Sequence, residues 1–259
     1  MKDVSNRLKA EAEFQNLKTK GKLDHFKNRR MKFYYLTNEA LKFYQKVLSE
    51  NTLGKKIIVV GCADGGVTPL AKAGAEKVLG VDIASEPIKI LNEGIEKEKL
   101  SNTASAIVGN AESLDVPKNS FDVICCLGVL HHLDIQKAAE SWSKVLNKDG
   151  LVVMEEPMAY NPIVALYRLL TPKMRTDDEH PLVPADIKLL KKYFKQVDVQ
   201  GYVLLSIFSL FFVYIYKSDE LRDKSNKFLE KVDGLLLKRF KFLNYFCWTS
   251  VIVLREPCN

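Results

Sequence analysis

The apolar positions of the chain recur with two different spacings, and these predict two kinds of element. Near the N-terminus they lie three to four residues apart, which predicts helices over 5–20 and 33–50. From Lys55 onward they form short, largely β-branched runs, which are typical of buried strands. The strands predicted from these runs are 57–60, 77–81, 104–108, 121–127, 151–155, 196–201 and 245–254.

Helical stretches separate most of these strands. They are predicted from the first glycine loop to Ala73 and over 87–99, 136–146 and 185–193, with a turn at 147–150. Strands that alternate with helices predict an α/β fold with a doubly wound, Rossmann-like sheet of seven mostly parallel strands. N-terminal helices precede this sheet, and a helical insertion precedes its last strand. Ligands of such sheets bind at the carboxyl ends of the strands.

The same pattern predicts two parts of unequal size. Residues 1–50 are expected to form an N-terminal helical lid or arm. Residues 51–259 are expected to form the main domain, with the helical insertion over 203–244. An apolar run at 203–216 opens this insertion, and it is shorter than the roughly 20 residues that a membrane-spanning helix needs.

The charge of the chain is unevenly distributed. Its 259 residues carry a formal net charge of +7, and residues 1–32 alone hold ten basic and four acidic side chains. The remainder is therefore nearly neutral, which does not suit a globular nucleic-acid-binding domain. The basic segment also lacks the interleaved aromatic residues that stack on bases. We expect a lid or docking segment there, and no nucleic-acid partner.

Cysteine and histidine usage indicates the compartment and the absence of a metal site. The five cysteines are odd in number and have no metal-ligand spacing, which suits free thiols in a reducing compartment. The polar N-terminus does not resemble a signal peptide, so a cytoplasmic location is expected. The four histidines also lack ligand spacing, and no metal site is predicted.

A glycine-rich loop follows the first predicted strand. Glycines at positions 61, 65 and 66 suit a tight turn in which the backbone approaches a ligand closely. Asp82 ends the second strand, 21 residues after Gly61, where a carboxylate can accept hydrogen bonds from both hydroxyls of an adenosine ribose. These two features are shared by dinucleotide sites and S-adenosylmethionine sites.

Four further segments distinguish these cofactors. They occur in the order 109–114, 121–124, 129–133 and 145–150, and they read GNAESL, FDVI, VLHHL and VLNKDG. Together with the glycine loop they resemble the class I S-adenosylmethionine-dependent methyltransferases. The resemblance covers residues 35–160 and is strongest to the small-molecule branch that includes the ubiquinone and menaquinone biosynthesis methyltransferases. It implies S-adenosylmethionine as cofactor and methyl transfer to a small molecule.

The resemblance also implies roles for residues after the first two strands. Gly61, Ala63 and Gly65 would line the methionine part of the cofactor. Asp82 would hold the ribose, and Ile83 would lie against the adenine.

Further cofactor contacts are implied after the third and fourth strands. Asn110 and Ala111 would meet the adenine edge, and Leu127 would be a backbone contact. The chain departs from the family at Val59, where an acidic residue is usual, at Ala63, where glycine is usual, and at Asn110, where aspartate is usual. We expect these departures to weaken or alter cofactor contacts without abolishing binding.

Two histidines are candidates for the chemistry. A base is needed only when the methyl acceptor must lose a proton, and histidine titrates near neutral pH. His131 and His132 follow the fourth strand, and Glu156 ends the neighbouring fifth strand, so the carboxylate could orient one imidazole ring. The alternative is that the two histidines only cap the strand and shape the cofactor wall.

Residues implied in acceptor binding lie in three places. Tyr34 belongs to the predicted lid, whereas Arg175 and His180 lie in a polar loop after the fifth strand, together with Arg168 upstream. This loop either faces the acceptor, which would then carry an anionic group, or forms a self-contained ion-pair cluster. The aromatic run of the insertion is either core or an apolar lid, with a peripheral membrane contact left open.

The sequence therefore predicts an enzyme that methylates a small-molecule acceptor, with oxygen favoured over carbon or nitrogen. Two other classes remain as alternatives. One is a non-catalytic binding protein with a degenerate methyltransferase fold, and the other is a nicotinamide-dependent oxidoreductase. The acceptor and the oligomeric state are not predicted.

Overall fold

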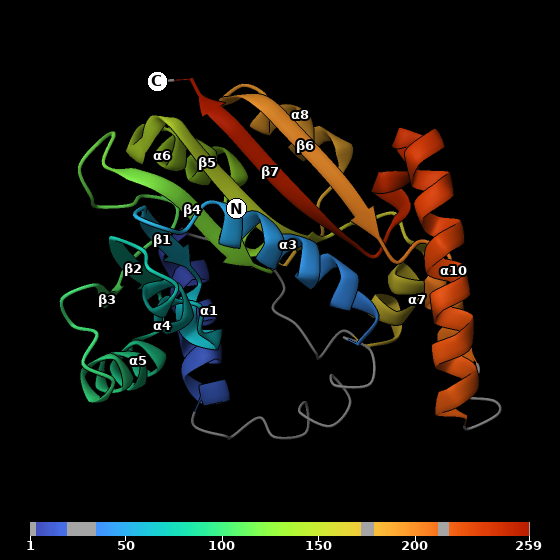
Figure 1. Ribbon diagram of the computed structural model, residues 1–259, viewed down its shortest axis with the longest axis horizontal. Helices are drawn as coiled ribbons and strands as arrows, with labels where there is room; N and C mark the ends of the chain where they lie inside the picture. Colours follow the sequence, from blue (N-terminus) through green and yellow to red (C-terminus); the bar gives the residue numbers. More distant parts are fainter. Residues whose placement is uncertain (1–3, 20–34, 172–178, 212–217, 259) are drawn as a thin grey trace.

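The computed structural model describes residues 4–19, 35–171, 179–211 and 218–258. Within them lies one seven-stranded sheet in the order β3-β2-β1-β4-β5-β7-β6 (Figure 1). Its strands are β1 (Lys56–Val60), β2 (Lys77–Asp82), β3 (Ala104–Val108), β4 (Phe121–Leu127), β5 (Leu146–Pro157), β6 (Phe194–Tyr202) and β7 (Thr249–Pro257).

The strand directions confirm the predicted doubly wound, mostly parallel sheet. Strands β1 to β5 pair in parallel, and only β7 runs antiparallel to both of its neighbours, β5 and β6. The chain winds from β1 outward to β3, then returns to the centre and winds the other way from β4. The reversal lies between β1 and β4, so a ligand crevice is expected at their carboxyl ends.

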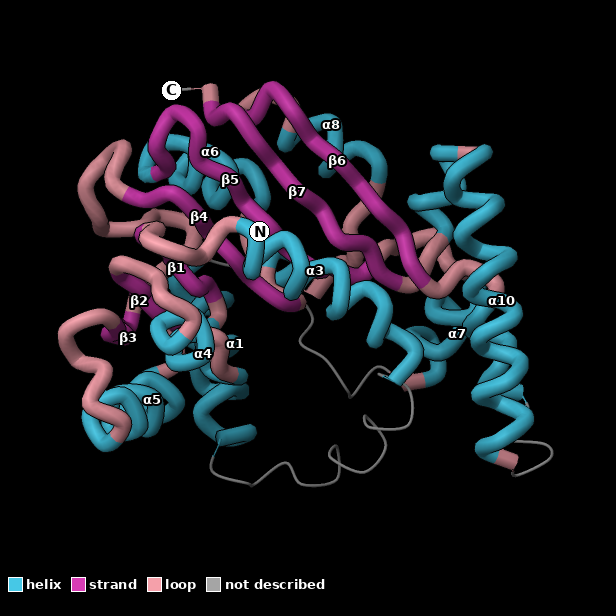
Figure 2. Tube along the Cα trace, viewed as in Figure 1, coloured by secondary structure: helices cyan, strands magenta, loops and turns pink. Residues whose placement is uncertain are grey.

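Helices cover both faces of the sheet, as Figure 2 shows. Successive residues of a strand point to opposite faces, and β1 has a buried β-branched side chain at every position from 57 to 60. Val59 packs in one core layer with α3 (Asn38–Glu50), α4 (Val67–Lys72) and α5 (Ser85–Lys97). Ile58 packs in the other layer with α6 (Ile135–Val145) and α8 (Pro184–Leu190).

The two N-terminal helices occupy different positions. Helix α1 (Val4–Thr19) contacts α5, whereas α3 lies on the sheet itself. A short 3-10 turn, η2 (Tyr35–Thr37), precedes α3, so the helix predicted over 33–50 begins at Asn38. Ala40, Tyr44, Val47 and Leu48 are buried along one stripe of α3. This spacing places all four on one helix face and makes α3 part of the domain core.

Two predicted boundaries were wrong. The turn predicted at 147–150 lies within β5, because the β4–β5 pairing jumps from Phe121↔Leu146 to Val123↔Leu151 and takes up the extra residues as an irregularity. The final strand begins at Thr249 rather than at residue 245. The residues before it form a 3-10 helix, η7 (Lys241–Phe246), whose Asn244 accepts a hydrogen bond from the Gly201 N–H at 2.8 Å.

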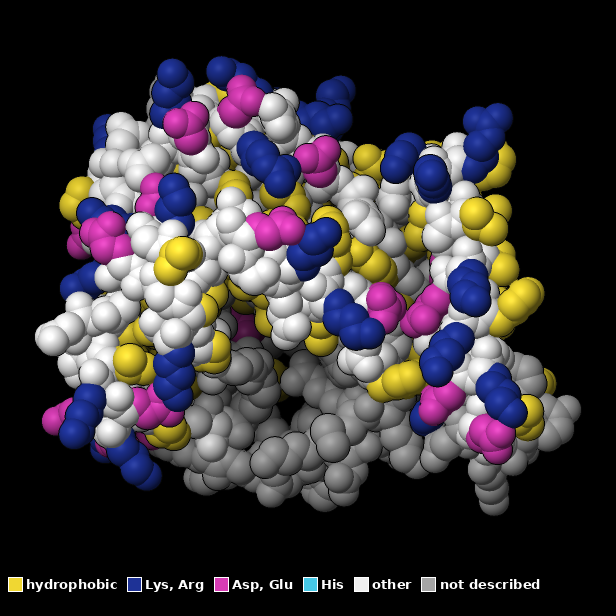
Figure 3. All heavy atoms as spheres, viewed as in Figure 1, with side chains coloured by type: hydrophobic (Ala, Val, Ile, Leu, Met, Phe, Trp, Pro, Cys, Tyr) yellow, Lys and Arg dark blue, Asp and Glu magenta, His cyan; other side chains and the backbone are white. Residues whose placement is uncertain are grey.

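The predicted helical insertion before the last strand is confirmed. It contains η6 (Ser206–Ser209), the 21-residue α10 (Asp219–Arg239) and η7, while residues 212–217 of the apolar run lie outside the described part. Helix α7 (Pro162–Leu170) packs Ile163 and Val164 against the same small apolar cluster as Ile207 of η6. Figure 3 shows hydrophobic, basic and acidic side chains interspersed along α10. Among the described helices, none has the length and apolar character needed to cross a bilayer.

Candidate active site

The loop after β1 is shaped by glycines that no other residue replaces without strain. Gly61 has φ 68°, and a Cβ atom there would lie 2.4 Å from the Cγ2 atom of Val129. Gly65 and Gly66 have φ values of 110° and 97°. These backbone conformations favour glycine. The loop therefore packs directly against the chain that follows β4, and between them they form one wall of a cavity.

Asp82 connects this loop to the start of α5. It is 7% exposed at the end of β2, and its Oδ2 accepts a hydrogen bond from the Ala63 N–H at 3.0 Å. Its Oδ1 accepts one from the Ala84 N–H at 2.9 Å. The carboxylate therefore positions the loop, and it also lines the cavity.

The cavity lies where the sequence predicts the cofactor. It encloses about 110 Å³ at the carboxyl ends of β1, β2 and β4. Of the eight predicted cofactor residues, Gly65 is absent from the lining, and the other seven line it: Gly61, Ala63, Asp82, Ile83, Asn110, Ala111 and Leu127. Gly128 and Val129 also line the cavity but were not predicted as cofactor residues. The glycine directly after β4 is the sequence feature that could have indicated them.

Helix α1 closes this cavity. Arg7, Leu8, Glu11 and Gln15 are among the residues that line it, although the sequence assigned this segment only a general role as a lid. The guanidinium of Arg7 donates a hydrogen bond to the His132 carbonyl oxygen at 2.7 Å and forms an ion pair with the buried carboxylate of Glu112. The helix is thus held against the segment that carries the two histidines.

A buried carboxylate organises those histidines. They lie in the 3-10 turn η4 (Leu130–His132) after β4. The Oε1 atom of Glu156 accepts hydrogen bonds from the N–H groups of Val129 at 2.9 Å and Leu130 at 2.7 Å. Its Oε2 atom lies 2.7 Å from Nδ1 of His131. Of the two histidines, it is therefore His131 whose ring Glu156 orients.

The electrostatics of this group follow from burial and hydrogen bonding. Burial opposes ionisation of Glu156, but the hydrogen bonds from His131 and from two backbone N–H groups outweigh it and lower the pKa of the carboxyl. In the neutral form of His131, the charged acceptor beside Nδ1 places the single ring proton there and leaves Nε2 as the hydrogen-bond acceptor. Burial, followed by the nearby charge of His131, lowers the pKa of His132. His132 also lines the cavity, and its lowered pKa favours the neutral ring there.

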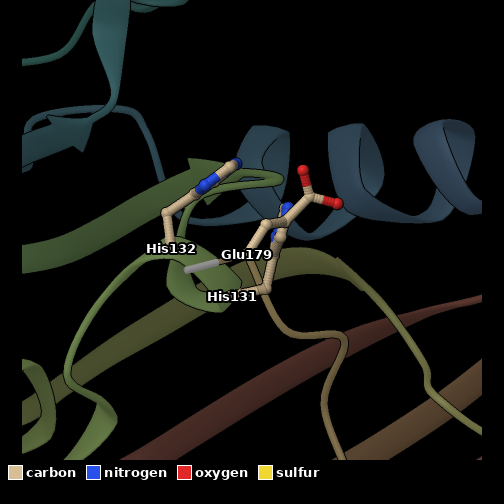
Figure 4. Close-up of side chains that lie close together, drawn as sticks. All are labelled: His131, His132 and Glu179. Carbon is tan, nitrogen blue, oxygen red and sulfur yellow. The ribbon is translucent and has the colours of Figure 1, made fainter. Parts of the chain in front are cut away.

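Glu179 joins the two histidines from a distant part of the sequence. Ligand atoms of His131, His132 and Glu179 all lie within 4.8 Å of one another (Figure 4). Such a set is compatible with a divalent cation, although no metal site was predicted. However, the Glu179 carboxylate already accepts a hydrogen bond from Arg168 at 2.5 Å. The spacing of residues in the sequence could not indicate this group, because Glu179 lies 47 residues after His132.

The predicted acceptor residues are only partly within the described structure. The His180 N–H donates a hydrogen bond to the His131 carbonyl oxygen at 3.0 Å, so the polar loop returns to the histidine turn. Arg168 is engaged by Glu179, which corresponds to the ion-pair alternative for this part of the loop. Tyr34 and Arg175 lie outside the described residues.

Comparisons with known proteins agree with this arrangement. Residues 58–154 match the model of a methyltransferase domain family. A ubiquinone biosynthesis O-methyltransferase of Actinobacillus pleuropneumoniae serotype 5b is 30% identical over 46% of this chain and 52% of its own length. The uncharacterized methyltransferase YcgJ of Bacillus subtilis is 27% identical over 45% of this chain and 49% of its own length. The chain thus spans about half the length of the curated relatives it matches.

Solved structures share the fold at low sequence identity. Phosphoethanolamine N-methyltransferase 2 of Haemonchus contortus, in complex with S-adenosyl-L-methionine, aligns with a TM-score of 0.58 and 18% identity over 87% of this chain and 56% of its own. Geranyl diphosphate C-methyltransferase of Streptomyces coelicolor, in complex with Mg²⁺, geranyl diphosphate and S-adenosyl-L-homocysteine, aligns with a TM-score of 0.57 and 10% identity over 86% and 80%.

These findings define the fold of the protein. The chain has the α/β fold of the class I methyltransferases, and residues 58–154 match the model of a methyltransferase domain. The predicted resemblance is confirmed. The fold by itself does not determine the reaction, because the [4+2]-cyclase SpnF aligns equally well, with a TM-score of 0.56 and 15% identity over 84% of this chain and 82% of its own.

Proposed function

We propose that the protein transfers a methyl group from S-adenosylmethionine to a small-molecule acceptor. The observation that carries this proposal is the cavity at the carboxyl ends of β1, β2 and β4, where seven of the predicted cofactor residues meet beside His132. The methyltransferase domain match supports the same cofactor, as do structural neighbours described with S-adenosylmethionine or S-adenosylhomocysteine.

The chain's own residues fit this cofactor. Asp82 lines the cavity, where its carboxylate can accept hydrogen bonds from the ribose hydroxyls, and Gly61 leaves a space that a Cβ atom would fill. Bound S-adenosylmethionine would supply an electrophilic sulfonium methyl group. Val59 is buried in the core layer beneath α3 to α5, so it provides no carboxylate for the cofactor's ammonium. We expect the main chain of the glycine loop to hold that end instead.

Cofactor entry requires α1 to move. The cavity of about 110 Å³ is below the roughly 300–1,000 Å³ of ordinary small-molecule sites, and α1 supplies much of its lining. Arg7 and Glu112 would separate as the helix withdraws from the histidine turn. This movement gives the N-terminal segment the role of a lid that was expected from its position and charge.

We further propose oxygen as the methylated atom and His131 as its base. Glu156 holds Nδ1 of His131, so Nε2 can accept the proton of an acceptor hydroxyl, in the way a buried carboxylate orients histidine in hydrolases. Because Glu156 touches His131 and not the acceptor, it is a positioning residue. His132 is expected to form part of the cofactor wall. General-base catalysis of this kind contributes about 10²–10⁴-fold to the rate.

A single-turnover assay with catechol as a simple probe acceptor tests the base. His131→Asn should lower the rate by about 10²–10⁴-fold and remove the acidic limb of its pH profile. His132→Asn is the matched control, and we expect it to weaken cofactor binding while keeping that limb. An unchanged pH profile in His131→Asn refutes the base. Activity that EDTA abolishes and Mn²⁺ or Zn²⁺ restores would instead assign His131, His132 and Glu179 to a metal.

Calorimetry distinguishes the remaining classes of function. We expect the full chain to bind S-adenosylhomocysteine and not NADH. Failure to bind S-adenosylhomocysteine or S-adenosylmethionine at millimolar concentration would favour a non-catalytic binding protein. Binding of NADH in their place would favour an oxidoreductase.

A further inference from the structure

The two edges of the sheet differ in how their main-chain groups are bound. The edge at β3 is closed by the Asn92 side chain of α5, which donates a hydrogen bond to the Ala106 carbonyl oxygen at 2.9 Å and accepts one from the Ala106 N–H at 3.0 Å. At the other edge, β6 pairs with β7 only. Within the described residues, the main chain of 195–200 has no hydrogen-bond partner outside β7. Because half of the peptide groups of an edge strand point away from the sheet, β6 offers a row of unpaired N–H and C=O groups.

A groove of about 1090 Å³ runs along this open edge. Every residue of β6 from 197 to 202 lines the groove. Successive residues of a strand point to opposite faces of a sheet, so this continuous lining places the groove at the edge of β6 itself. Its walls include Ile187 of α8, Phe43 and Val47 of α3, and Leu237 of α10, which lies beside β6 (Figure 1). Its described lining shares no residue with that of the cofactor cavity.

Basic side chains flank the groove from two sides. Five lysines line it, all of them exposed and none in an ion pair with another described residue: Lys191, Lys227, Lys231, Lys238 and Lys241. The first of these follows α8, and the other four belong to α10 and η7. The open strand edge therefore lies between unpaired positive charges.

The acidic residues of the groove are already engaged. Each of the four has a partner: Glu39 has Lys42, Asp198 has Arg255, Glu230 has Asn226, and Asp233 has the main-chain N–H groups of residues 204 to 206. Asp233 is also buried, so its charge serves the insertion and not the groove. The charge that remains for a ligand is therefore positive, although acidic and basic residues share the lining.

We propose that this groove binds an extended acidic peptide segment of a partner protein, which adds a strand to β6. Main-chain hydrogen bonds to 195–200 supply the affinity of such strand addition, and the lysines on both sides select a segment that carries carboxylates. Six residues of strand span about 20 Å. The interaction does not depend on the proposed methyl transfer, because the groove is separate from the cofactor cavity.

Two other occupants fit the groove less well. A second copy of the chain that paired through its own β6 would place a whole sheet beside α10 and would bring the unpaired lysines of both copies together. Nucleic acid would neutralise the lysines, but its phosphate oxygens only accept hydrogen bonds and would leave the C=O groups of the strand edge without donors. An acidic peptide satisfies both the strand edge and the lysines.

Fluorescence anisotropy of a labelled six-residue peptide that alternates glutamate with valine tests the proposal on the full chain. Binding should weaken as salt is raised, because the lysine contribution is screened. The same peptide with glutamine in place of glutamate should bind about tenfold more weakly, as expected for the loss of three surface ion pairs. Two further peptides are N-methylated, one at its glutamates and one at its valines. At least one of them should lose binding, because its N–H groups toward β6 are removed.

Variants of the protein locate the binding site. Replacing Lys227, Lys231 and Lys238 together by Gln should weaken binding of the glutamate peptide about tenfold. The matched control replaces three exposed lysines outside the groove and should bind like the parent: Lys89, Lys97 and Lys118. Hydrogen exchange adds a readout that charge alone does not move, since a bound strand should slow exchange in 195–200 and leave β3 unchanged.

Several results would overturn the proposal. The peptide could fail to bind at millimolar concentration, neither N-methylated peptide could lose affinity, or exchange in 195–200 could stay the same when the peptide is bound. Equal binding by the groove variant and the control lysine variant would also overturn it. Protection of 195–200 that rises with protein concentration in the absence of peptide would assign the edge to a second copy of the chain instead.

Discussion

The cofactor half of the molecule and the C-terminal insertion are organised by different kinds of contact. In the cofactor half, carboxylates bind backbone N–H groups of neighbouring strand-end loops: Asp82 holds the loop after β1, and Glu156 holds the turn after β4. In the insertion, Asp233 attaches one long helix to a short segment 27 to 29 residues away. The first half is a closed network around a cavity, whereas the second is a helix attached along one side and exposed along the other.

This difference separates what the family shares from what distinguishes this chain. The matched methyltransferase domain, residues 58–154, ends before α7, α10 and η7. Among the described residues, 13 of the 19 exposed large apolar side chains lie between residues 160 and 246, the stretch that contains these elements. We therefore expect changes in the cofactor half to affect cofactor binding and global stability. Changes in the insertion should act locally.

Glu156→Gln should produce the largest effect. The amide keeps one acceptor but places an N–H₂ group where a buried carboxylate now accepts hydrogen bonds from two backbone N–H groups and His131. Breaking such a buried charged pair costs about 3–5 kcal/mol. Urea unfolding followed by the fluorescence of buried Trp142 should show this loss. The exposed Glu140→Gln, which breaks only a surface pair with Lys144, should change stability by less than about 0.5 kcal/mol.

Asp82→Ala should come next, with about a hundredfold weaker binding of S-adenosylhomocysteine. Two hydrogen bonds to a charged acceptor contribute about 1.5 kcal/mol each, and their loss corresponds to that factor. Calorimetry measures it directly. Asp122→Ala is the matched control, because Asp122 also binds a backbone N–H group but at the opposite end of the sheet. Equal affinities of the Asp82 and Asp122 variants would contradict the assigned cofactor site.

Asp233→Ala should have a smaller and local effect. It leaves the backbone N–H groups of residues 204–206, one buried and two partly buried, without their acceptor, at a cost of about 2 kcal/mol. Hydrogen exchange should accelerate in α10 and η6 and stay unchanged in β1 to β5, and binding of S-adenosylhomocysteine should persist. The exposed Asp223→Ala should leave exchange in α10 unaltered. If Asp233→Ala also weakens cofactor binding, the two regions are not independent.

Glu155 lies at the border between the two regions. Ionisation of its carboxyl should have the smallest effect on stability. Burial, followed by the charge of Glu156, raises the pKa of its carboxyl to about 7, although a hydrogen bond from Thr249 of β7 opposes the shift. The folded protein then binds more protons than the unfolded chain between about pH 4.5 and 7, so stability falls as pH rises through this range. We expect a loss of about 1–2 kcal/mol by pH 8, after allowance for partial exposure.

Glu155→Gln should remove this pH dependence and be the more stable protein at pH 8. Thermal unfolding at pH 5 and pH 8 measures both. A parent protein whose stability is the same at the two pH values would contradict the raised pKa.

Much of the fold could be predicted because its signals are local. The β-branched runs, the glycines after β1 and the acidic residue that ends β2 each depend on backbone geometry within a few residues. The two boundary errors arose where distant contacts decided the outcome. Asn244 binds Gly201 across 43 residues and stabilises a 3-10 helix before β7, and a register shift against β4 absorbs the predicted turn in β5.

The candidate site divides in the same way. The sequence predicted that Asp82, Asn110 and His132 lie at one edge of the sheet. The pattern of apolar residues shows where each strand ends, and the carboxyl ends of parallel strands meet at that edge. It could not tell which histidine Glu156 orients, since that depends on the side-chain directions of two adjacent residues in a 3-10 turn.

The sequence by itself thus determined the alternation of strands and helices, the position of the cofactor loops and the acidic residue beside them, all of which are encoded in short-range spacing. Only the tertiary structure decided that His131 receives the carboxylate, that Glu179 joins the histidines, that α1 covers the cavity and that α10 exposes Leu221, Phe228 and Leu235. Each of these depends on contacts between residues far apart in the chain. The geometry of these contacts is set by the packing of whole helices and strands, and the local pattern of apolar residues carries no information about that packing.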